Sequence, residues 1–294
     1  MENLTRDEHT IPQVYLRGFS CEYIDIRDDA RKDHTIFFHR FGKEKQVERA
    51  VPVKDICKKR DAYEVYDSEG NIVLQNHLER FFGVFEKKYG KYRTELEKKV
   101  FYEENYKIKN FLKNEEKNFW AAYMIIQILR LPQTLGLAED LSLEMFNEIG
   151  KREAENIARL LVLPFFKDIQ IDDKELQLFN ALLIPMSNMY WGVGVDKTER
   201  LITSDNPVFI ARDDDIDGEY TRIIFPLTSK ICLMLFGNEY KRSVPKNFLF
   251  PINDEIREEI NCCMAIKAFE QVFSNRKLSK MEIMQMEQMR LVDG

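Results

Sequence analysis

The sequence lacks the cysteine and histidine patterns of metal sites and of disulfide-rich secreted proteins. Its five cysteines are odd in number, no two of them are separated by two residues, and its four histidines are scattered. Zinc sites and disulfide frameworks both require regular spacings of these residues. We therefore expect free thiols, a reducing compartment and no zinc site.

Signals for membranes, export and nucleotide binding are also missing. Residues 1–9 are polar and charged, and no apolar run approaches the roughly 18 residues that span a bilayer. Neither the Gly-x-Gly-x-x-Gly pattern nor the Gly-x4-Gly-Lys pattern occurs. These absences predict a cytoplasmic protein without a membrane segment.

The composition that is present is typical of a globular protein. Hydrophobic residues make up 44% of the 294 positions and charged residues 32%. The net charge of −6 disfavours a broad nucleic-acid surface but leaves room for a local basic groove. The length allows one large domain or two closely packed ones.

Hydrophobic periodicity divides the chain into a β-rich part, a helical part and a second β-rich part. Expected helices cover 9–19, 75–99, 115–131, 142–163, 173–189, 253–268 and a Met-rich end from 278. Expected strands cover 34–41, 46–51, 62–66, 191–195, 200–203, 208–211, 220–225, 230–236 and 271–273. In two places the pattern is more specific, because 191–195 and 200–203 suggest a hairpin and the acidic stretch 212–218 suggests a surface loop.

This order predicts an α+β fold in which the two β-rich ends share one sheet and residues of about 75–190 form a helical layer. Residues 1–277 would make a single domain, followed by a Met-rich helix or tail over 278–294. The alternative is two domains divided near residue 190.

Several short motifs follow one another in a fixed order along the chain. They are His9-x-x-Pro12-x-x-Tyr15-Leu16-x-x-Phe19, Glu79 and Glu86, Gln127-x-x-Arg130-x-Pro132, Thr203-Ser204-Asp205-Asn206-Pro207-Val208 and Pro226-Leu227. With these motifs the chain resembles a widespread bacterial family of unknown function, over residue 9 to about residue 273. The resemblance implies a single-domain bacterial protein and carries no activity with it.

The motif residues are polar groups placed within or at the ends of apolar elements. Gln127 and Arg130 are three residues apart and therefore share a face of a largely apolar helix. A buried arginine needs an anion beside it. Asp205, Glu79 and Glu86 are the candidate carboxylates.

One interpretation of this cluster is a hydrolase or phosphodiesterase that acts on nucleic acid or nucleotides, such as a toxin or defence effector. His9 would be the general acid and base, and Arg130 would bind an anionic group with help from Gln127 and Asn206. Asp205 would orient His9 or, together with Glu79, hold a divalent metal ion.

The alternative is a non-catalytic module that binds an anionic ligand or a protein, with the polar motif residues forming a structural network. Asp205 would then cap its own turn, and Arg130 would be held in a salt bridge. A third possibility is an interaction protein that forms homo-oligomers or binds partners through its terminal methionines, Met281, Met284, Met286 and Met289.

Overall fold

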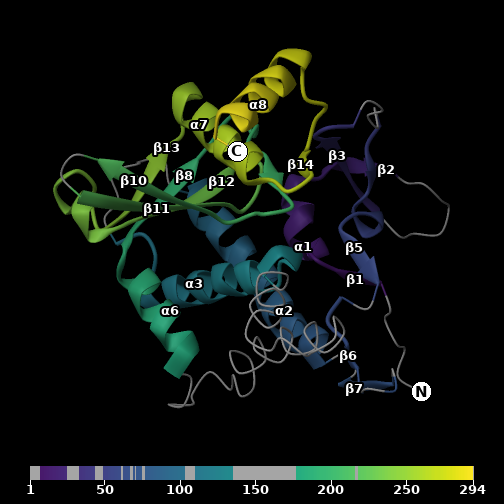
Figure 1. Cartoon of the computed structure of the whole chain (residues 1–294). Helices are drawn as coiled ribbons and strands as arrows, with labels where there is room; N and C mark the ends of the chain where they lie inside the picture. The colour runs from purple at the N-terminus through teal and green to yellow at the C-terminus, as the bar shows by residue number, and fades with distance from the viewer. Residues whose placement is uncertain are drawn as a thin grey trace.

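The computed structural model describes residues 7–24, 33–43, 49–60, 62–66, 69, 71–74, 77–102, 110–134, 177–215 and 218–293. Helices and several sheets alternate in the expected order, and the α+β class is confirmed (Figure 1). The helix expected over 142–163 lies outside the described residues. The expected division into a domain 1–277 and a tail stays a prediction.

The first of two five-stranded sheets comes entirely from the C-terminal part of the chain. Its strand order is β10-β11-β12-β8-β13. The strands are β8 (Tyr190–Val195), β10 (Phe209–Asp215), β11 (Gly218–Pro226), β12 (Ile231–Phe236) and β13 (Asn247–Pro251). All neighbours are antiparallel except β13, which runs parallel to β8.

The second five-stranded sheet joins the two ends of the chain, as expected. Its order is β2-β3-β14-β9, with β4 beside β3. The strands are β2 (Cys21–Ile24), β3 (Asp33–Arg40), β4 (Val51–Pro52), β9 (Thr203–Ser204) and β14 (Gln271–Ser274). Strands β3 and β14 are antiparallel, so N-terminal Phe38 lies opposite C-terminal Phe273.

Two short pairs of antiparallel strands complete the described β structure. β1 (Asp7–His9) pairs with β5 (Lys58–Arg60), and β6 (Val65–Tyr66) pairs with β7 (Ile72–Leu74). The β1–β5 pair places His9 directly opposite Lys58.

The helices lie on both sides of the first sheet. In Figure 1, α3 (Asn114–Leu129) and α6 (Gln177–Asn188) lie below it, and α7 (Asp254–Lys267) and α8 (Lys280–Asp293) lie above it. α2 (His77–Tyr102) packs against α3 and against the short α1 (Gln13–Leu16). Single 3-10 turns cover Arg17–Phe19, Val53–Asp55 and Asn238–Arg242.

Strand alternation explains how one sheet serves two hydrophobic cores. Phe225 and Leu233 belong to the core shared with α2 and α3, whereas their neighbours Ile224 and Met234 belong to the core shared with α7 and α8. Successive side chains of a strand point to opposite faces. The nearly continuous apolar sequence of β12 is therefore buried on both sides.

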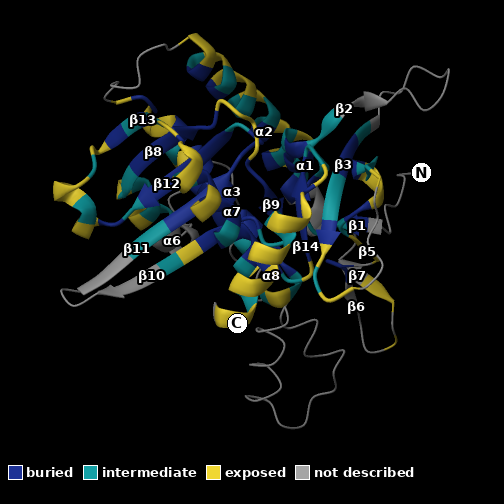
Figure 2. Ribbon diagram, turned by 90° about the horizontal axis from the view of Figure 1, so that it is seen from above, coloured by how far each residue is buried: buried dark blue, intermediate teal, exposed yellow. Residues whose placement is uncertain are grey.

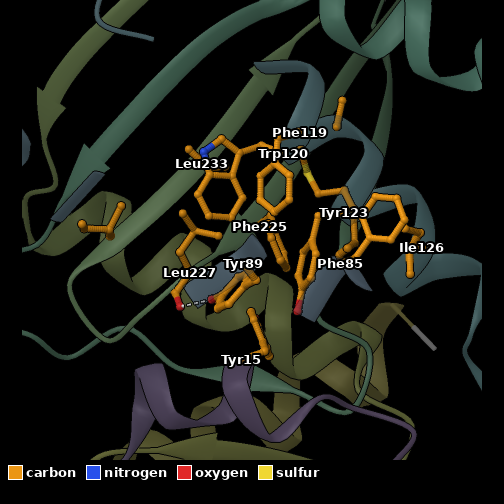
Figure 3. Close-up of a cluster of buried hydrophobic side chains, with 14 of the residues drawn as sticks. Tyr15, Phe85, Tyr89, Phe119, Trp120, Tyr123, Ile126, Phe225, Leu227 and Leu233 are labelled. Atoms are coloured by element: carbon orange, nitrogen blue, oxygen red, sulfur yellow. Dashed lines mark hydrogen bonds between the residues drawn. The ribbon is translucent and has the colours of Figure 1, made fainter. Parts of the chain in front are cut away.

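An aromatic cluster fills the first core where α1, α2 and α3 meet the sheet (Figure 3). The ring of Tyr15 stacks on that of Phe225 with centroids 5.4 Å apart, and Tyr89 stacks on Tyr123 at 4.6 Å. The hydroxyl of Tyr89 donates a 3.1 Å hydrogen bond to the carbonyl of Leu227. Tyr89 is thus held both by the packing of its ring and by the polar partner of its hydroxyl.

The N-terminal helix is shorter than expected. We predicted a helix over 9–19, but His9 ends strand β1 and α1 begins only at Gln13. The hydroxyl of Thr10 donates to the carbonyl of Cys57, 3.2 Å away. Pairing with β5 gives the backbone of Asp7–His9 hydrogen-bond partners in an extended conformation.

The hairpin expected from 191–195 and 200–203 is wrong. β8 pairs with β12 and β13, whereas Thr203–Ser204 forms β9 in the other sheet. The fully buried carboxylate of Asp196 accepts hydrogen bonds from the backbone amides of Thr198 and Arg200. This tight Asx-type turn redirects the chain from one sheet to the other.

The acidic stretch 212–218 is also not a simple surface loop. β10 continues to Asp215 and β11 begins at Gly218, so most of the stretch belongs to a long antiparallel hairpin. Charge alone predicted a loop, but the end of a hairpin can carry charged residues equally well.

Candidate functional site

Arg130 lies at the centre of the polar cluster, directly after the end of α3. Only 1% of its surface is exposed. Its guanidinium donates to Glu86 Oε1 at 3.0 Å and to the backbone carbonyl of His9 at 2.6 Å. The ring of Phe82 lies 4.4 Å from Cζ, within the range of cation–π attraction. Arg130 thereby ties α2, α3 and β1 together.

The charge of Arg130 is retained despite its burial. Burial alone lowers the pKa of a guanidinium, but Tyr63 and Glu86 oppose this, and the net pKa is raised. Tyr63 also donates its hydroxyl to the carbonyl of Arg130 at 3.1 Å. Among the expected carboxylate partners with described side chains, Glu86 is in contact with Arg130, and its side chain is 28% exposed.

His9 lies at the outer edge of this cluster and is partly exposed. Burial lowers the pKa of its imidazole, Lys58 and Arg130 act in the same direction, and Glu86 and the Lys54 carbonyl oppose them. The ring is therefore neutral at pH 7. Nε2 lies 3.2 Å from the carbonyl of Lys54, so Nε2 carries the proton and Nδ1 retains a lone pair.

Strand β5 gives this edge of the molecule a positive charge. Lys58, Lys59 and Arg60 are all exposed, and Lys54 is exposed close by in sequence. The exposed carboxylate of Asp55 lies 3.8 Å from the ammonium of Lys58 and neutralises part of that charge. His9 thus faces a local basic edge on a protein whose net charge is −6.

Gln127 borders the cluster from within α3, one turn before Arg130. It is buried, as is Tyr123 one turn earlier, and neither Gln127 Oε1 nor the Tyr123 hydroxyl has a hydrogen-bond partner among the described residues. Burial raises the pKa of Tyr123 well above its usual value, so the phenol stays protonated. The expected substrate-binding role of Gln127 stays a prediction.

Asp205 is engaged elsewhere. Its two carboxylate oxygens accept hydrogen bonds from the backbone amides of Phe269, Glu270 and Gln271, at 2.8, 2.8 and 3.1 Å. Burial raises the pKa of the carboxyl, and these amides partly offset that rise. Asp205 therefore fastens the segment between α7 and β14, and within the described part of the chain its side-chain hydrogen bonds go to this segment and not to His9 or Arg130.

Asn206 has a similar structural setting. Its side-chain amide donates to the carbonyl of Lys267 at 3.1 Å, and its backbone amide donates to the hydroxyl of Ser204 at 3.2 Å. The turn that carries Asp205 and Asn206 is thus bonded on two sides to the connection that follows α7. Glu79 lies in α2, but its side chain lies outside the described part of the chain.

The comparison with family models places the chain among known sequences. The chain belongs to DUF4238, a family of proteins of unknown function. The match covers residues 8–278, which includes every motif quoted above. Neither the curated proteins nor the solved structures contain a match to the chain.

Within this DUF4238 region, the structure brings distant motifs into direct contact. The hydroxyl of Tyr15 lies 2.7 Å from that of Thr203 and donates to the carbonyl of Pro226, also at 2.7 Å. A Cβ on Gly18 would lie 2.6 Å from the carbonyl oxygen of Leu227, so a side chain there would collide with the backbone. Much of the motif pattern therefore serves the packing of the N-terminus on the first sheet.

The sequence did not indicate two contributors to the polar cluster around Arg130. Tyr63 follows no recognisable motif, and only the fold places its ring over Arg130. The run Lys58-Lys59-Arg60 was visible in the sequence, but nothing there indicated that it pairs with His9. Among the described residues, no group of three or more His, Cys, Asp or Glu side chains is placed to hold a metal ion, and no helix is long and apolar enough to cross a membrane.

Proposed function

We propose that the protein hydrolyses phosphoesters, with nucleic acid or nucleotides as the substrate class and His9 as the acid–base group. The observation that carries the proposal is a neutral, partly exposed imidazole beside the basic strand β5. A general base must be unprotonated and accessible, and an anionic substrate needs cations near the base. His9 meets the first requirement and Lys58, Lys59 and Arg60 meet the second.

In this reaction, Nδ1 of His9 takes a proton from water as the water oxygen bonds to phosphorus. The bond from phosphorus to the leaving alcohol oxygen then breaks, and the imidazolium returns the proton to that oxygen. The Lys54 carbonyl holds the Nε2–H tautomer, the orienting role first expected of Asp205. Glu86 stabilises the transient imidazolium, while Arg130 holds Glu86 in place.

A second candidate is a module that binds the same anionic ligands without turning them over. The engagement of Arg130 and Asp205 in internal contacts favours it, because these polar groups then maintain the fold. A role as a toxin or defence effector stays a prediction in either case.

The decisive experiment is a comparison of His9→Gln with the full wild-type chain. Substrates would be bis(p-nitrophenyl) phosphate and fluorescent single-stranded RNA and DNA oligonucleotides. We expect wild-type turnover, a loss of roughly 100-fold or more in His9→Gln, and an unchanged melting temperature. His34→Gln is the matched control, because His34 is a partly buried histidine on β3, remote in sequence from the cluster.

The pH dependence provides a second readout. Because the pKa of His9 is lowered, the base form persists below pH 6.5, and kcat/KM should fall only at more acidic pH. Lys58→Glu, which reverses the charge opposite His9, should raise KM without a matching loss of kcat, whereas Lys241→Glu, on an exposed turn remote in sequence, should not. Oligonucleotide binding that survives in His9→Gln, with no turnover in the wild type, would instead establish the binding module.

A further inference from the structure

The outer face of α8 carries no charge although it is exposed. We define the α8 face as Met281, Met284, Gln285, Gln288, Met289, Leu291 and Val292. At 100° per residue these positions fall within an arc of about 160°. Exposure is 71% for Met281, 68% for Met284 and 86% for Leu291. Figure 2 shows the same helix as a largely exposed ribbon at the surface.

The opposite side of α8 is anchored firmly, so the α8 face has a fixed orientation. Met286 is 4% exposed within the second core. The guanidinium of Arg290 donates to the carbonyls of Ala265 and Ala268 at the end of α7 and lies 4.3 Å from the ring of Phe41. His39 of β3 lies 3.4 Å from Glu287. Exposed apolar residues on an anchored helix are not explained by the packing of this chain.

A groove of about 500 Å³ runs between α7 and the α8 face. α8 contributes Met281, Met289 and Val292 to its lining, and α7 contributes Glu258 and Cys262. Methionine side chains are flexible and polarisable, which suits them to contact with apolar side chains of a partner. A groove of this kind fits the helix-in-groove mode of recognition.

The α7 side of the groove is acidic. Asp254, Glu255, Glu258 and Glu259 are all exposed on α7. Arg200 and Arg257 also line the groove, but both are paired, since Arg257 contacts Asp254 at 2.6 Å and Arg200 lies 3.8 Å from Glu282. Glu259 is paired with Arg222, so Glu255 and Glu258 are the acidic residues of α7 without an ion pair among the described residues, and Glu258 lines the groove. The groove therefore combines an apolar wall on α8, made by Met281, Met289 and Val292, with an acidic wall on α7, made by Glu255 and Glu258.

We propose that α7 and α8 form a docking groove for a basic amphipathic helix of a partner protein. Apolar side chains of that helix, spaced three and four residues apart, would lie on the α8 face, and its lysines or arginines would meet Glu255 and Glu258. A second copy of this chain would bring acidic α7 against acidic α7, and an anionic membrane would be repelled by the same residues. Charge therefore selects the basic helix among the three occupants.

The test uses the full chain and two fluorescent 18-residue helical peptides of identical leucine pattern, one carrying lysines and the other glutamates. Binding is measured by fluorescence anisotropy at low and at high salt. Met281→Gln combined with Val292→Gln removes the apolar wall, and Glu255→Lys combined with Glu258→Lys reverses the acidic wall. The matched controls are Val84→Gln and Glu95→Lys, which alter one exposed apolar and one exposed acidic residue on α2.

We expect the lysine peptide to bind and the glutamate peptide to bind at least tenfold more weakly. The apolar-wall variant should lose at least tenfold in affinity, the charge-reversed variant should prefer the glutamate peptide, and the controls should match wild type. Unchanged melting temperatures establish that the variants fold. Equal binding of both peptides, or binding of neither, overturns the proposal. So does a doubled mass in light scattering that the apolar-wall variant abolishes, or sedimentation with phosphatidylserine vesicles.

Discussion

Arg130, at the end of α3, and Met284, within α8, have surroundings opposite to those that their chemistry predicts. The charged side chain is 1% exposed and surrounded by partners, whereas the apolar one is 68% exposed. Arg130 lies within the region matched by DUF4238, and α8 begins at Lys280, after the match ends at residue 278. The polar cluster is therefore a feature of the family region, and the apolar surface lies outside it.

The two regions also differ in how many of their side chains remain accessible to a ligand or a partner. In the polar cluster, Arg130 is bonded internally to Glu86 and to the His9 carbonyl, whereas the side chain of His9 is partly exposed and bonded through Nε2. On α8, the internal contacts are on one side and the opposite side is open. We therefore expect mutations of the internally bonded groups of the first region, such as Glu86 and Arg130, to lower stability, and mutations on the α8 face to leave it almost unchanged.

The largest loss of stability should follow from Glu86→Leu. This change leaves the buried guanidinium of Arg130 without its carboxylate, and removal of one partner of a buried pair costs about 3 to 5 kcal/mol. The free energy of unfolding from urea titrations measures it. The double variant Glu86→Leu with Arg130→Met should recover part of the loss; if the single variant is as stable as wild type, the pair does not hold the fold.

Within α8, Met286→Ala and Leu291→Ala should lower the free energy of unfolding by very different amounts. Met286 is 4% exposed and Leu291 86% exposed, so the first substitution creates a cavity and the second does not. We expect a loss of about 2 to 4 kcal/mol for Met286→Ala and less than about 0.5 kcal/mol for Leu291→Ala. Thermal and urea unfolding measure both losses. If the two variants lost the same free energy of unfolding, the α8 face would be covered in solution.

Asp205→Asn should have an intermediate effect. The asparagine retains one acceptor oxygen and places its amide NH2, a donor, against the backbone amides of Phe269 to Gln271, which are themselves donors. The loss should be about 1 to 3 kcal/mol. Asn206→Ala, which removes a single bond to Lys267, is the matched control. An Asp205→Asn variant that stays fully stable yet loses phosphodiester turnover would return Asp205 to a catalytic role.

The smallest expected effect is on the pH dependence of the melting temperature. Burial lowers the pKa of His39, and Glu287 only partly opposes this. A histidine with a lowered folded pKa stabilises the fold fully above its unfolded pKa of about 6.5. That stability is lost as the pH falls towards the folded pKa. His39→Gln should therefore flatten the decrease in melting temperature between pH 7.5 and 5. An identical decrease in the variant and the wild type would exclude His39 as a source.

Periodicity predicted the long elements well because their patterns extend over many residues. The helix expected over 115–131 appears as α3, Asn114–Leu129, and strands 191–195 and 230–236 appear almost unchanged. Short or polar segments were predicted less well. Residues 7–9 pair with a strand about fifty residues away, and the turn at Asp196 moves the chain between sheets, and no local pattern contains either feature.

For the candidate site, residue chemistry predicted that Arg130 would be buried against a carboxylate but not which one. Glu86, Glu79 and Asp205 were equivalent in sequence, because each is a carboxylate near an apolar element. The choice depended on where α2 crosses α3 and on which backbone amides lie near residue 205. Both the crossing and the position of these amides depend on packing between residues far apart in the chain.

The sequence by itself determined the α+β class, the membership of DUF4238 and the set of polar residues that the fold must accommodate. These follow from local periodicity and from residue types. Only the tertiary structure decided that Glu86 pairs with Arg130, that Asp205 fastens the end of α7, and that His9 faces a basic strand. It also decided which methionines of α8 are exposed. The physical reason is that burial and pairing depend on contacts between residues far apart in the chain, which no local pattern encodes.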